Sequence, residues 1–195
     1  MNIFMREFRE TLEGYIGILV PEGIYMDLDR LKPGYNFSKA LATAICRSAC
    51  MIVVYTPLYQ EKPYCIQEFR AMQLLAEQRM PILRKNDLPS KNLSMIIPIV
   101  LRGDFQDLPT KIKEIQYFDF SQFYFTTGRL LRSAKYRNMF QDIAKTIYRH
   151  CMDSKELERR GFSQDCNSFV FPSEEEAVKS WGPRTRVRST FPGHL

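Results

Sequence analysis

The stretch Cys50–Tyr55, CMIVVY, decides how this sequence folds. It is a continuous apolar run rich in β-branched residues, without the apolar–polar alternation of a strand that has one face in water. Such a run is typical of a parallel sheet that is covered on both faces. A second apolar run, Met95–Leu101 (MIIPIVL), predicts another strand. Its Pro98 has no N–H group to give to a neighbour, which favours an outer position in the sheet.

Amphipathic helices are predicted between and around these strands. Apolar side chains recur at helical spacing in residues 4–13, 38–48, 63–80 and 136–151. Pro63 suits the first turn of the third of these helices, because the first N–H groups of a helix have no helical partner. Short strands are also predicted at residues 24–26 and 117–120. This alternation of strands and helices predicts an α/β fold with a parallel sheet.

The helical periodicity fades after the last of these helices. We therefore divide the chain into a domain of residues 1–151 and a C-terminal extension of residues 152–195, which we expect to be partly flexible. A capping-box pattern, SEEE, predicts one short helix within the extension. The aromatic side chains of Phe169, Phe171 and Trp181 either dock the extension on the domain or form a site for a partner.

Composition narrows the classes of function. The chain has 195 residues, with 28 basic and 22 acidic side chains and a net charge of +6. The basic excess lies in residues 1–151, which suits a ligand or partner that carries phosphate, but no basic stripe is present, so nucleic acid is not expected as the main partner. No apolar run approaches the ~20 residues that cross a bilayer, and no signal sequence is evident. We expect a cytoplasmic protein with no membrane partner.

The cysteines and histidines do not predict a metal site. The five cysteines are Cys46, Cys50, Cys65, Cys151 and Cys166. Their number is odd, they form no Cys-x-x-Cys pair, and only two histidines accompany them, so the usual zinc spacings are missing. We expect free thiols in a reducing compartment, several of them buried. His150, near the end of the last helix of the domain, is expected to interact with the helix dipole there.

Two loops are left as candidate sites, because the chain has no Gly-x-Ser-x-Gly elbow, no Walker loop and no Gly-x-Gly-x-x-Gly. One is Asp27–Phe37, and the other leads from Thr56 into the helix that carries Tyr64 and Glu68. Ligands of open α/β sheets bind beyond the carboxyl ends of the strands, where both loops are expected. Tyr64 and Glu68 are four residues apart and share a helix face. On spacing alone, a half-buried tyrosine beside a solvated glutamate is the commoner interpretation. For the loop Asp27–Phe37, an ordinary turn is likewise the commoner interpretation.

Four pieces in order give a resemblance to the Toll/interleukin-1 receptor (TIR) domain family, of the kind found in bacteria. They are IYMDLDRLKPGYNF (24–37), LATAICRSACMIVVYTPLY (41–59), YCIQEF (64–69) and MIIPIVLRG (95–103). They resemble, in turn, the family's second strand with its BB loop, helix B with the third strand, the signature on helix C, and the fourth strand. The resemblance covers about residues 3–151 and implies a flavodoxin-like parallel sheet with helices on both faces.

The resemblance implies one of two functions. Many bacterial TIR domains cleave the nicotinamide–ribose bond of NAD+ and serve as defence or signalling effectors, whereas others are non-catalytic scaffolds that bind further TIR domains. For the first function, NAD+ is a substrate and no cofactor is implied. The catalytic glutamate of helix C matches Glu68, and the aromatic residue before it matches Tyr64. Asp27 and Arg30 match polar positions near the substrate pocket, and Gly34 matches the glycine that shapes the loop.

One element of the family is not found in this sequence, so either the reading frame starts too late or another segment takes its place. The family begins with a buried strand A that lies between strands B and C, but this chain starts at Met1 in a predicted helix. Neighbouring strands are ~4.8 Å apart, so strands B and C without strand A would lie about 10 Å apart with unpaired edges. The residues of strand A that contribute to the family's pocket are missing as well.

Overall fold

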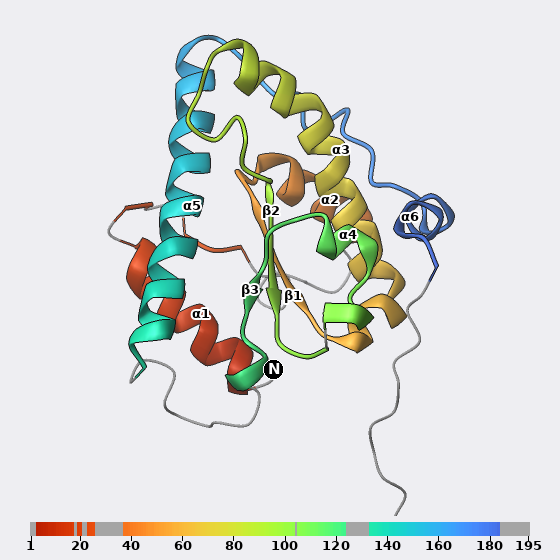
Figure 1. The fold of residues 1–195 in the computed structure, drawn as a ribbon. Helices are drawn as coiled ribbons and strands as arrows, with labels where there is room; N and C mark the ends of the chain where they lie inside the picture. Colours follow the sequence, from red (N-terminus) through yellow and green to blue (C-terminus); the bar gives the residue numbers. More distant parts are fainter. Residues whose placement is uncertain are drawn as a thin grey trace, which may run out of the picture.

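The computed structural model describes residues 3–17, 19–20, 23–25, 37–103, 105–123 and 133–183. Its elements, in chain order, are α1 (Ile3–Ile16), α2 (Phe37–Arg47), β1 (Met51–Tyr55), the 3-10 helix η2 (Pro57–Glu61), α3 (Pro63–Lys85), β2 (Ile96–Val100), η3 (Phe105–Asp107), α4 (Thr110–Lys113), β3 (Phe118–Asp119), η4 (Ser121–Phe123), α5 (Ala134–Arg159) and α6 (Glu174–Trp181). The three strands form a parallel sheet in the order β1-β2-β3, and helices cover both of its faces (Figure 1). The predicted α/β class is therefore confirmed.

The two faces of the sheet belong to two separate cores. Alternate side chains of β1 and β2 point to opposite faces, so Val53 and Tyr55 pack with α2, α3 and α6, whereas Ile97 and Ile99 pack with α1 and α5. Full burial of such a side chain contributes about 1.5–3 kcal/mol. The second core is also rich in ring contacts, which include Phe8, Phe120 and Phe140. The apolar pattern of the strands thus requires a helical layer on each face.

The CMIVVY run forms strand β1 as predicted, but β1 lies at an edge of the described sheet. All five residues of β2 are buried, whereas Met51, Ile52 and Val54 of β1 are only partly buried. Ile24 and Tyr25 do not form the strand predicted at 24–26, whose last residue lies outside the described residues. In the described part of the chain no strand precedes β1.

The position of Pro98 corrects a prediction, because this proline lies in the central strand and not in an outer one. The backbone hydrogen bonds between β1 and β2 explain how the sheet tolerates this proline. Met95 accepts from Met51 and Leu101 donates to Tyr55, so odd-numbered residues of β2 direct their backbone groups toward β1. Pro98 therefore has its nitrogen on the side of β3. Since β3 pairs only with Ile99 and Val100, the missing N–H costs no bond between β1 and β2.

Helix α5 continues beyond the predicted end at residue 151 and runs to Arg159, and this corrects the interpretation of His150. His150 lies in the interior of the helix, 2% exposed, with its Nε2 atom 3.0 Å from the carbonyl oxygen of Ser94. One turn later, Asp153 accepts bonds from the backbone N–H and the hydroxyl of Ser90, at 2.6 and 2.5 Å. His150 therefore contacts the loop before β2 and does not interact with the dipole at a helix end. Among the helices of the described ranges, α5 included, none combines the length and apolarity that a membrane span requires.

The C-terminal extension packs on the domain. Ser173 caps α6 as the SEEE pattern predicts, by accepting a bond from the backbone N–H of Glu176 at 3.2 Å. Trp181 is buried in the core that contains α3, and Phe169 and Phe171 pack against the same core. The described part of the extension thus shares a core with the domain. The division of the chain at residue 151 remains a prediction.

A disulfide between Cys46 and Cys166 corrects the prediction that all five cysteines are free thiols. It joins α2 to the extension across 120 residues of sequence, with Cα atoms 5.6 Å apart. This pairing depends on the docking of the extension, which spacing along the chain does not reveal. Cys50, Cys65 and Cys151 are not part of this disulfide and carry thiols.

The environment of His150 predicts a pH dependence of stability. Burial lowers the pKa of His150 below its ordinary 6.5, although the bond to Ser94 and the charge of Asp153 oppose this shift. As pH falls through 6.5, the unfolded chain binds a proton at this residue before the folded chain does, so the free energy of unfolding decreases. We expect His150→Gln to reduce this loss between pH 7.5 and 5.0, measured by urea unfolding. Equal losses in both proteins would contradict the prediction.

Candidate functional site

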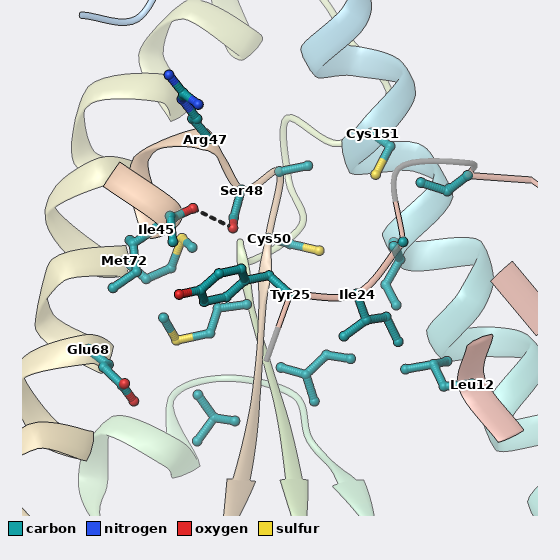
Figure 2. A pocket seen from close by; sticks show the side chains of 18 of the residues that line it. Leu12, Ile24, Tyr25, Ile45, Arg47, Ser48, Cys50, Glu68, Met72 and Cys151 are labelled. Carbon is teal, nitrogen blue, oxygen red and sulfur yellow. Dashed lines mark hydrogen bonds between the residues drawn. The ribbon is translucent and has the colours of Figure 1, made fainter. Parts of the chain in front are cut away.

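A cavity of about 930 Å³ lies along the outer edge of β1. Its walls come from α1, α5 and the residues Val20, Gly23, Ile24 and Tyr25 on one side, and from α2 and α3 on the other (Figure 2). Its volume is in the range of small-molecule sites, about 300–1,000 Å³. Most of the described lining side chains are apolar, among them Leu12, Ile16, Leu41 and Met72.

The backbone of β1 contributes polar groups to this cavity. Met51 donates its N–H to Met95, and the carbonyl group of Tyr55 accepts from Leu101, so these residues direct their backbone groups toward β2. Backbone direction alternates along a strand, and the N–H and C=O groups of Ile52 and Val54 are therefore directed to the opposite edge. That edge lines the cavity. The cavity thus occupies the side of β1 on which the missing strand was expected.

Glu68 reaches the cavity from one face of α3. Pro63 occupies the first turn of this helix, as predicted. Cys65, Glu68 and Met72 follow at spacings of three and four residues, so they share a helix face, and all three line the cavity. Figure 2 shows the carboxylate of Glu68 directed into the space between α3 and β1. Among the described lining residues, Glu68 and Glu158 are the only carboxylates.

Two tyrosines accompany Glu68. Tyr59, on η2, lines the cavity and donates its hydroxyl to the carbonyl oxygen of Cys65 at 2.7 Å. Burial raises the pKa of the Tyr59 phenol well above its ordinary value, and the charges of Cys65 and Glu68 raise it further. Tyr59 is therefore neutral at physiological pH and lies within the electrostatic influence of Glu68. The ring of Tyr25 lies beside β1 with its hydroxyl directed toward α3 (Figure 2).

The structure brings together only part of the predicted site. Glu68 lines the cavity, but Tyr64 does not, and its side chain is 52% exposed in the first turn of α3. Its predicted contact with substrate remains a prediction. Asp27, Arg30 and Gly34 lie outside the described residues.

Sequence reasoning missed the two tyrosines of the cavity. Tyr59 had one usable signal, since it follows the carboxyl end of a strand, where ligands of α/β sheets bind. Tyr25 had a similar signal, because it immediately precedes the loop that was singled out as a candidate site. Neither tyrosine stands in a periodic pattern that marks its direction.

Two thiols line the cavity on the side of α5. Burial raises the pKa of the Cys50 thiol, and the neighbouring Cys151 raises it further. Cys50 is therefore a neutral thiol and a weak nucleophile. In the described part of the chain, no three side chains of His, Cys, Asp or Glu gather as a metal site would require.

The arrangement suits the stabilisation of positive charge. A carboxylate beside mainly apolar walls interacts more strongly with a nearby cation than a fully solvated carboxylate does, because apolar groups screen charge less than water. Aromatic rings such as those of Tyr25 and Tyr59 offer flat surfaces to a planar group. Arg47 and Lys155 also line the cavity and supply positive charge for an anionic group of a ligand. The site thus fits a molecule with a reacting cationic centre and an anionic portion.

Comparison with known proteins gives one match. A family model described as TIR domain matches residues 19–131, which include β1, α3 and β2. No curated protein and no solved structure matches the chain significantly.

The raised pKa of Cys50 predicts slow alkylation in the folded protein. Thiolate is the reactive form, so iodoacetamide at pH 8 is expected to label Cys50 at least about 10-fold more slowly in the folded protein than in urea. Mass spectrometry of the peptide that contains Cys50 measures both rates. Cys46 and Cys166 serve as internal controls, since their disulfide protects them until it is reduced. Equal labelling of Cys50 in both states would contradict the prediction.

Proposed function

The chain belongs to the TIR domain family, and on this basis we propose that it cleaves the nicotinamide–ribose bond of NAD+ at the cavity that Glu68 lines. The observation that carries this proposal is the direction of the Glu68 carboxylate into a cavity of about 930 Å³ with mainly apolar walls. The match of Glu68 to the family's catalytic glutamate on helix C supports the proposal independently of this geometry. The same resemblance suggests a defence or signalling effector.

In the proposed reaction, the bond between C1′ of the ribose and the nicotinamide nitrogen breaks. Both bond electrons go to that nitrogen, which makes the leaving nicotinamide neutral and leaves positive charge on the ribose. The Glu68 carboxylate stabilises this oxocarbenium-like charge and binds the ribose hydroxyl groups. Water then adds to C1′ and loses a proton, which yields ADP-ribose. Attack by another atom of the same nucleotide instead yields a cyclic isomer.

The remaining residues of the proposal have supporting positions. Tyr59 offers a neutral ring beside Glu68, and Arg47 and Lys155 offer charge to the pyrophosphate. Tyr25 lines the cavity and precedes Asp27 by two residues in the sequence. We include Asp27, Arg30, Gly34 and Tyr64 in the proposal as substrate contacts.

Removal of the Glu68 charge tests the proposal. We expect Glu68→Gln, which preserves size, to lower the rate of nicotinamide release from NAD+ by about 100-fold or more, since it removes a preorganised electrostatic interaction. Chromatography of the products at high protein concentration measures the rate. Glu77→Gln is a matched control on the same helix, because Glu77 is exposed and binds Arg70. Release that is equal in wild type and Glu68→Gln would refute the assignment.

A scaffold function is the second candidate, and one observation favours it. Leu58 and Phe105 are 68% and 62% exposed. They follow the carboxyl ends of β1 and β2, which are neighbours, so they lie at the same edge of the sheet. Contiguous exposed apolar patches mark contact surfaces, and in this alternative Leu58 and Phe105 belong to one such patch. In this alternative the chain binds further TIR domains and performs no chemistry.

Introducing charge at Leu58 and Phe105 distinguishes the scaffold function from NAD+ cleavage. We expect Leu58→Glu together with Phe105→Glu to weaken self-association of a scaffold by about 10-fold or more, because charge at an apolar contact must be desolvated. Analytical ultracentrifugation measures the association constant. Glu68→Gln is the matched control and should leave association unchanged. A wild-type chain that stays monomeric at every concentration would contradict the scaffold function.

A further inference from the structure

The C-terminal segment of residues 160–183 lies against the back of the helix that carries Glu68. Figure 1 shows α6 on the outer side of α3, away from the sheet. Three side chains of α3 hold this segment, and they flank Glu68 in the sequence. Gln67 donates to the carbonyl oxygen of Pro172 at 3.0 Å, the Arg70 guanidinium lies 3.5 Å from Glu176, and the Phe69 ring meets Trp181 edge-on with ring centroids 5.1 Å apart. The second turn of α3 thus contacts the cavity on one face and the C-terminal segment on the other.

Trp181 extends this contact to the wall of the cavity. Its side chain is 4% exposed, and its ring centroid lies 5.8 Å from that of Tyr59 at an angle of 33°. Tyr59 lines the cavity, whereas Trp181 is not among the residues that do. Within the part of the chain that the structure describes, the buried indole N–H of Trp181 has no hydrogen-bond partner, so ring packing holds it in place. A displacement of Trp181 would leave Tyr59 without the surface behind its ring.

Another part of the segment is fixed to α2, which lies on the same side of the cavity as α3. Cys166 forms the disulfide with Cys46 in the last turn of α2, and α2 contributes residues to the cavity. Arg79 of α3 donates to the carbonyl oxygens of Cys46 and of Ser48, the latter at 2.7 Å. The C-terminal segment therefore links α2 and α3, the two helices on one side of the cavity.

We propose that Trp181 is a positioning residue of the Glu68 site, which acts through its contacts with Tyr59 and Phe69, so that the C-terminal segment is a working part of that site. This inference rests on the proposed NAD+ cleavage. Trp181 itself does not touch the substrate. It holds the Tyr59 ring against the cavity and fixes the turn of α3 from which Glu68 projects.

Steady-state kinetics of nicotinamide release with the full chain test this role. Trp181→Ala is expected to lower kcat/KM about 10- to 100-fold, because small displacements of groups that contact substrate have effects of this size. Trp181→Phe is expected to retain most of the wild-type kcat/KM, because it keeps an aromatic ring in place. Val178→Ala, on the same helix and in the same core, controls for simple loss of packing. All rates are divided by the folded fraction from circular dichroism.

A double-mutant cycle distinguishes positioning from general stabilisation. If Trp181 acts through Tyr59, then Trp181→Ala should have much less effect on kcat/KM in a Tyr59→Ala background than in wild type. An equal effect in both backgrounds would overturn the inference. So would a loss of activity no greater than that of Val178→Ala, or no loss at all.

The fluorescence of Trp181 gives a readout that does not require turnover, since the chain contains one tryptophan. NAD+ added to Glu68→Gln is expected to change the emission in a saturable way, and Tyr59→Ala should abolish the change. A saturable change without nicotinamide release from wild type would contradict the proposed function alone. Release from wild type that Trp181→Ala leaves unaltered would contradict the positioning role alone. Absence of both release and emission change would contradict both.

Discussion

The parallel pairing of β1 with β2 is the interaction on which the rest of the structure depends. It joins Met51–Tyr55 to Ile96–Val100 in register and sends alternate side chains into two cores. Each core requires a helical layer, which α1 and α5 provide on one face and α2 and α3 on the other. Because β1 lies at the edge of the described sheet, its backbone groups on the other side face the cavity. The same pairing therefore positions both the cores and the candidate site.

Helix α3 connects the pairing of the strands to the position of Glu68. Its residues Ile66, Phe69 and Met72 are buried, which fixes the rotation of the helix about its axis. Once that rotation is set, helical spacing brings Glu68 to the cavity and Gln67 and Arg70 to the C-terminal segment. A single carboxylate on a rigid helix, opposite an open strand edge, is well placed to act on a cationic centre. The contribution of the extension is to support this helix from the side away from the sheet.

Much of the fold could be predicted from sequence because its signals are local. The CMIVVY run, the four helical periodicities and the SEEE cap each depend on neighbouring residues, and each element formed close to its predicted place. The errors concern contacts between distant residues. Pro98 fits a central strand because β3 is short, Cys46 meets Cys166 because the extension docks, and His150 is buried because α5 continues. None of these facts is encoded in local spacing.

The candidate site shows the same difference between local sequence signals and contacts of distant residues. Glu68 was predicted as a site residue from its match to the family's glutamate on helix C, whereas Tyr59 and Trp181 approach the site from other elements, and their mutual contact depends on tertiary packing. A crystal structure of Glu68→Gln with NAD+ tests the central claim most directly. We expect the nucleotide to lie in the cavity beside β1, with a ribose hydroxyl within hydrogen-bond distance of residue 68 and the nicotinamide near Tyr59. A nucleotide bound elsewhere, or a cavity without nucleotide at saturating NAD+, would contradict it.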